Sequence, residues 1–150
     1  MNQTKLFILV TVMIGFLAGC AGNGKGLDEN GNPIGSDGGG GNLAFDPTFS
    51  NIQQNVFNPI CTRCHIGAGA PQGLRLSSDS AYAMLVGVSS AERPQYLRVQ
   101  PGNPNDSYII RKLEGGPDIA GAQMPYNLPP LSRETINSIR AWIQKGAPND

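Results

Sequence analysis

The chain has 150 residues, enough for one ordinary domain and little besides. Its 11 Lys and Arg residues balance 11 Asp and Glu residues, so no polybasic surface points to a nucleic-acid partner. The cysteines are Cys20, Cys61 and Cys64, an odd number, so at least one of them has a role other than an internal disulfide.

Residues 1–19 have the layout of a secretory signal peptide. Lys5 precedes the apolar run 6–17, which is too short to span a bilayer comfortably. Residues 17–20, Leu-Ala-Gly-Cys, resemble the lipobox of bacterial lipoproteins. The resemblance implies cleavage before Cys20, lipid on its sulfur and a stable membrane anchor. The alternative is a plain signal peptide or a buried helix with an incidental cysteine.

Such an anchor places the rest of the chain in the cell envelope, facing the periplasm. Ala21 stands where an aspartate is associated with inner-membrane retention in some bacteria, which favours the outer membrane. Residues 22–41 are mostly Gly, Asn, Asp and Ser, with too little apolar surface to offset the entropy of ordering. We therefore expect a lipidated cysteine and flexible tether over 20–44, followed by one domain over 45–150.

Helical periodicity dominates that domain. Asp46 and Pro47 suit an N-cap and first helical position, and they open a helix that runs to about residue 57. Its apolar stripe consists of Phe45, Phe49, Ile52 and Val56. Further helices are expected over 79–86 and over 104–113, the latter opened by an Asn-Pro signal.

The last helix has the clearest pattern, with Ser132 as N-cap, three isoleucines on one face and a Lys-Gly end at 145–146. No alternating pattern of comparable length predicts a strand. The expected fold class is all-α.

The chemistry is concentrated in residues 61–65, Cys-Thr-Arg-Cys-His. This is the spacing at which two thiols reach the vinyl groups of one porphyrin, with the adjacent histidine beneath the iron. His65 is the only histidine, so the motif predicts one covalent haem c and excludes a bis-histidine haem within one chain. A zinc site would need four ligands, and a thioredoxin-like dithiol would follow a buried strand rather than a helical stripe.

Met124 is the candidate for the second iron ligand. It lies in a loop before Pro125, which biases it away from helical geometry, and a soft thioether opposite histidine raises the haem potential. Met84 is its competitor, but the helical pattern around Met84 favours core packing.

From about Phe45 to Pro148 the chain resembles the small soluble c-type cytochromes: an N-terminal helix, Cys-x-x-Cys-His, a Met-Pro loop and a C-terminal helix with an aromatic residue, here Trp142. The resemblance implies that the first and last helices pack together around the haem, with His65 and Met124 on opposite sides of the iron. Residues 88–101 have no obvious counterpart in the smallest relatives and are interpreted as an insertion.

Residues 73–76, Gly-Leu-Arg-Leu, are also similar to a segment of some bacterial relatives. In that comparison Leu74 and Leu76 pack on the porphyrin, and Arg75 pairs with a propionate.

These observations predict an electron carrier rather than an enzyme, because the only histidine is used on iron and no distal acid-base group remains. Its partners are a redox donor and a redox acceptor, and it acts as a monomer or as a subunit of a respiratory complex. The alternatives are a haem enzyme or gas sensor with a labile sixth ligand, or a haem subunit fixed in a larger redox assembly.

Overall fold

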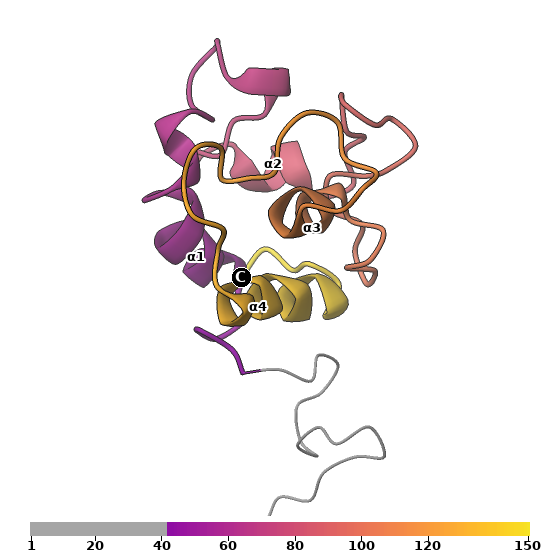
Figure 1. The fold of residues 1–150 in the computed structure, drawn as a ribbon. Coiled ribbons are helices and arrows are strands. Elements are labelled where there is room, and N and C mark those ends of the chain that lie inside the picture. Colours follow the sequence, from indigo (N-terminus) through magenta and orange to yellow (C-terminus); the bar gives the residue numbers. More distant parts are fainter. Residues whose placement is uncertain (1–41) are drawn as a thin grey trace, which may run out of the picture.

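Four α-helices build the part of the chain that the computed structural model describes, residues 42–150 (Figure 1). They are α1 Phe49–Ile52, α2 Ala81–Leu85, α3 Tyr108–Glu114 and α4 Arg133–Gln144. Within these residues, β-pairing is confined to three isolated bridges, all between residues 86 and 107. The predicted signal peptide, the lipidation site at Cys20 and the tether up to residue 41 lie outside the described residues.

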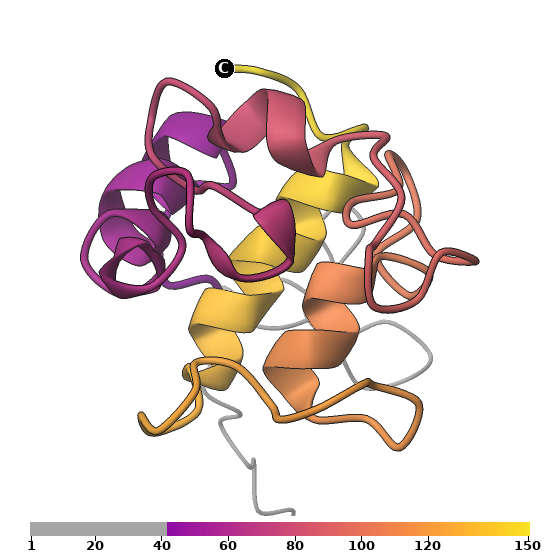
Figure 2. The same ribbon diagram turned by 90° about the horizontal axis from the view of Figure 1, so that it is seen from above.

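The core lies on α4, which packs against both α1 and α3 (Figures 1 and 2). Trp142 of α4 is fully buried, and its ring centroid lies 5.6 Å from that of Phe49 of α1. The indole Nε1 donates to the carbonyl of Pro148 at 2.8 Å, which satisfies the polar end of the ring and draws the C-terminal residues over the core.

The structure confirms the predicted last helix. Ser132 is its N-cap, with a side-chain oxygen that accepts from the amide of Thr135 at 3.2 Å. Ile136, Ile139 and Ile143 are all buried on the face that the spacing predicts. The hydroxyl of Ser138 accepts from the amide of Ala44 at 3.0 Å, so α4 also holds the start of the described chain.

The predicted start of the first helix is wrong by two residues. Thr48, and not Asp46, is the N-cap, because the side-chain oxygen of Thr48 accepts from the amide of Asn51. The amide of Phe49, the first residue of the helix, instead donates to the carboxylate of Asp150 at 2.7 Å. The helix then widens into a π-helical turn, Gln53–Phe57, and the predicted apolar stripe faces the core as expected.

The helix predicted from residue 104 begins later, at Tyr108. Asn103 and Pro104 form a separate turn, and the first amides of α3 bond to residues 97 and 98 instead. Tyr108 N donates to the carbonyl of Leu97 at 2.9 Å, and Ile109 N to that of Arg98 at 3.0 Å. The 88–101 segment therefore provides the N-terminal cap of α3. The helix predicted over 79–86 is confirmed with shorter bounds, as α2.

The buried tryptophan predicts the largest single loss of stability in α4. We expect Trp142→Ala to lower the free energy of unfolding by about 3–5 kcal/mol, because it empties a large core volume. Trp142→Phe should cost less, since an aromatic ring remains and the losses are the bond to Pro148 and the smaller part of the buried volume. Denaturant unfolding followed by circular dichroism measures both. Gln144→Ala, at an exposed position of the same helix, is the control and should stay within about 0.5 kcal/mol of wild type.

Candidate functional site

A cavity of about 510 Å³ opens between α2, α3, the segment after α1 and the loop between α3 and α4. Its volume is within the range of about 300–1,000 Å³ typical of small-molecule and cofactor sites. Most of the residues that sequence analysis singled out meet on its walls: Cys61, Cys64, His65, Leu74, Leu76 and Met124. Cys64 and Met124, 60 positions apart in the sequence, thus line the same cavity.

The two cysteines are held by a tight turn directly after the first helix. A 3-10 turn covers Cys61–Arg63, and the amides of Cys64 and His65 both donate to the carbonyl of Cys61, at 3.2 and 2.9 Å. Thr62 Oγ1 donates to the carbonyl of Asn58 at 2.7 Å and ties this turn to the end of the helical segment. Both thiols are free, and both face the same cavity.

Cys61 is not an activated thiol. Burial raises its pKa to about 12, so the sulfur stays protonated at neutral pH. Reactive dithiols of the thioredoxin type depend instead on a cysteine whose pKa is lowered. The dithiol alternative therefore gains no support from the environment of Cys61.

His65 has one ring nitrogen engaged by the protein. Nδ1 lies 3.0 Å from the carbonyl oxygen of Leu74, and since a carbonyl can only accept, Nδ1 carries the proton. In the neutral imidazole, Nε2 then keeps its lone pair. This is the arrangement found in metal-ligating histidines, where a partner on the second nitrogen fixes tautomer and ring orientation.

The backbone reinforces this contact. The amide of Leu76 donates to the carbonyl of His65 at 2.9 Å, so residues 74–76 run beside the histidine. Leu74 and Leu76 both line the cavity, whereas Arg75 between them does not. Side chains alternate across an extended segment, and Arg75 consequently faces away. Its assignment as a propionate partner stays a prediction without support from this placement.

Met124, and not Met84, reaches the cavity. Its amide donates to the carbonyl of Lys112 in α3 at 2.8 Å, which fixes the loop against that helix. Its side chain is half-buried and packs against the core. Met84 lies on α2, is not among the residues that line the cavity, and is only half-buried, so its predicted packing in the core stays a prediction.

Several polar residues of the cavity had no role in the sequence-based predictions: Arg63, Gln72, Ser90, Glu92, Arg98, Lys112 and Asn127. Arg98 donates to the carbonyls of Met84 and Gln72, both at 2.8 Å, and burial lowers its pKa. Apart from Arg63, which lies between the two cysteines, none of these residues belongs to a local sequence motif. Only the course of the 88–101 segment over the cavity brings Ser90, Glu92 and Arg98 to it.

A zinc site would need four ligands, and residues 42–150 contain no group of three or more His, Cys, Asp or Glu side chains arranged to hold a metal ion. Among the described residues, no helix has the length and apolar character needed to cross a membrane. No protein-family model, curated protein or solved structure matches this chain.

The raised pKa of Tyr108 leads us to expect that the free energy of unfolding falls in alkali. Burial raises its pKa, against an opposing effect of the Ala120 amide, and the hydrogen bond to Glu92 raises it further. In the unfolded chain a tyrosine ionises near pH 10, at its usual pKa of about 10. Because the folded state keeps the proton longer, its stability is complete below that pH and falls as pH rises toward the folded pKa.

Denaturant unfolding between about pH 9 and about pH 11 measures this slope. Tyr108→Phe should flatten it. Tyr126→Phe, at a position 61% exposed, should leave the slope at the wild-type value. Equal slopes for wild type and Tyr108→Phe would contradict the assignment.

Proposed function

We propose that this chain is a monohaem c-type cytochrome that carries single electrons. The observation that supports it most is that one apolar-walled cavity gathers two free thiols, a histidine with a free Nε2 and a methionine thioether. In a c-type haem, the two thiols would attach the porphyrin, and the histidine and the thioether would be the two protein ligands of the iron. The four groups come from two separate segments of the chain, residues 61–65 and the loop that contains Met124.

Each side chain has a defined part in this proposal. Cys61 and Cys64 attach the porphyrin through thioether bonds, and the turn Cys61–Arg63 fixes their spacing. His65 ligates iron through Nε2, while its bond to Leu74 keeps the ring from turning. Met124 supplies the second axial ligand and raises the reduction potential.

When bound, haem supplies an iron that cycles between the ferric and ferrous states. The chain keeps both axial positions filled and excludes water with apolar walls, which include Leu74 and Leu76 as proposed from the sequence. Low polarity around the iron and a thioether ligand both favour the ferrous state. The only histidine is used on iron in this proposal and leaves no distal acid-base histidine, so we propose a carrier and not an enzyme.

The proposal includes an all-α, cytochrome c-like fold for residues 45–150. The packing of α1 on α4 through Phe49 and Trp142, and the helices that surround the cavity, support it. It also includes lipid on Cys20, a tether over 20–44 and a periplasm-facing site. A tethered domain can turn the mouth of its cavity toward a donor and then toward an acceptor.

The identity of the second axial ligand separates an electron carrier from a haem enzyme or gas sensor, which need a readily vacated iron. In the purified haem protein, carbon monoxide binds ferrous iron only in the fraction of molecules from which the thioether has moved away. We expect Met124→Ala to raise the apparent affinity for carbon monoxide at least about tenfold and to lower the midpoint potential. Absorption titration and redox potentiometry measure the two effects.

Met84→Ala is the matched control, because it removes the same side chain from a position outside the cavity. It should bind carbon monoxide as the wild type does. If only Met84→Ala opened the iron site, the ligand assignment would be wrong. If the wild type bound carbon monoxide as readily as Met124→Ala, a sensor or an enzyme would be the better proposal.

A further inference from the structure

The 88–101 segment makes an ion pair at the edge of the cavity. Glu92 Oε2 lies 3.1 Å from Lys112 Nζ of α3, and the Glu92 and Lys112 side chains are only 19% and 10% exposed. The hydroxyl of Tyr108, one turn earlier on α3, donates to the same carboxylate oxygen at 3.0 Å. Because an uncompensated charge is costly at such a position, each member of the pair holds the other in place.

The same residues hold the loop that carries Met124. Lys112 Nζ also donates to the carbonyl of Ala120 at 2.7 Å, and the Ala120 amide donates to the hydroxyl of Tyr108 at 2.9 Å. The carbonyl of Lys112 accepts from the amide of Met124 at 2.8 Å. Both ends of the stretch from Ala120 to Met124 are therefore fixed to α3 through one residue, Lys112.

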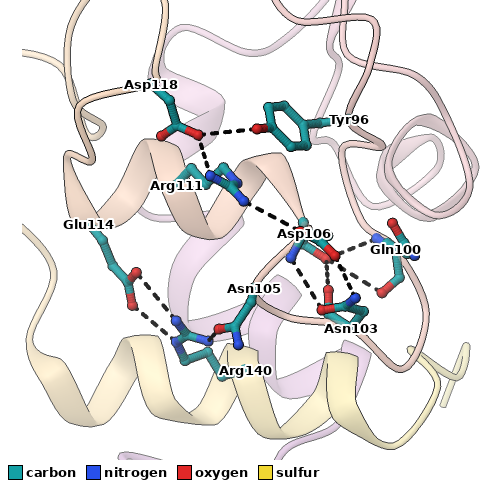
Figure 3. Close-up of polar contacts among 10 residues, drawn as sticks. Tyr96, Gln100, Asn103, Asn105, Asp106, Arg111, Glu114, Asp118 and Arg140 are labelled. Carbon is teal, nitrogen blue, oxygen red and sulfur yellow. Dashed lines mark hydrogen bonds and ion pairs between the residues drawn. The ribbon is translucent and has the colours of Figure 1, made fainter.

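A second set of contacts runs along the outer side of α3 (Figure 3). Arg111 pairs with Asp118 of the loop and with Asp106, and Tyr96 donates to Asp118 at 3.3 Å. The guanidinium of Arg111 lies 4.3 Å from the centre of the Tyr96 ring. Like Glu92, Tyr96 belongs to the 88–101 segment, so the segment contacts α3 through Glu92 and the loop after α3 through Tyr96.

We propose that Glu92 and Lys112 are positioning residues that keep the Met124 loop closed over the cavity, and that the 88–101 segment serves this purpose. The inference rests on the proposed function, because it assigns the loop to the sixth iron position. Glu92 orients the ammonium group of Lys112, which holds the carbonyl of Ala120, while the backbone carbonyl of Lys112 holds the amide of Met124. Neither residue touches the iron in this account.

The test measures how easily an external ligand displaces Met124. Imidazole is titrated into the ferric, purified haem protein, and the far-red charge-transfer absorption of the iron–thioether bond is followed at the same time. The apparent dissociation constant equals the intrinsic one divided by the fraction of open molecules. Glu92→Gln removes the charge from the pair, and we expect it to tighten imidazole binding at least about tenfold and to weaken the thioether absorption.

Glu114→Gln is the matched control. Glu114 belongs to α3, as Lys112 does, but its ion pair is with Arg140 of α4 and not with Lys112 or Glu92 (Figure 3). It should leave imidazole binding at the wild-type value. In a Lys112→Leu background, Glu92→Gln should add nothing further, because the pair is already lost.

Tyr108→Phe keeps the ring but loses the bonds to Glu92 and Ala120, so it gives a second variant if Glu92→Gln accumulates poorly. It should also tighten imidazole binding. Wild-type affinity in either folded variant, or an equal effect of Glu114→Gln, would overturn the inference. A wild-type protein without covalent haem, or without thioether absorption, would refute the proposed function itself. This result is seen in the wild type alone, so it can be distinguished from the variant results that would overturn the inference.

Discussion

The hydrogen bond from His65 Nδ1 to the carbonyl of Leu74, 3.0 Å long, orients the one imidazole of the chain and leaves Nε2 free for a metal. The bond also joins two segments that are separate in the sequence. With the return bond from the Leu76 amide to the His65 carbonyl, it places two leucines on the wall of the same cavity. The position of the histidine and the apolar character of its surroundings thus have one structural cause.

Sequence analysis succeeded where the determining contacts are local. The last helix was predictable because its cap, Ser132, and its buried face lie within one short stretch. The starts of the first and third helices could not be predicted in the same way. The amide of Phe49 bonds to Asp150, about 100 positions further along the chain, and the amide of Tyr108 bonds to Leu97, in the preceding segment. Met124 was proposed as a ligand from its loop and the proline that follows, and it lines the cavity. Arg75 was proposed from a resemblance, and the alternation of the extended backbone turns it away from the cavity.

The 88–101 segment shows what local patterns leave out. It contains no chemical motif, yet its backbone caps α3 and its side chains reach both the cavity and the loop after that helix. Arg98 bonds to two carbonyls of the neighbouring segments, and Glu92 pairs with a lysine that the sequence alone places only on a helix. In the proposed function, the segment would help to hold the loop that carries Met124, through contacts that exist only in the folded chain.

In the proposed function, this cavity holds a haem bonded to Cys61 and Cys64. Tandem mass spectrometry of a protease digest, on the protein purified from a host that attaches haem c, tests whether these bonds form. We expect one haem on the peptide that contains residues 61–65, joined through both sulfurs and retained after denaturation. Recovery of that peptide with two unmodified thiols, or with a disulfide between them, would show that the cysteines do not attach haem.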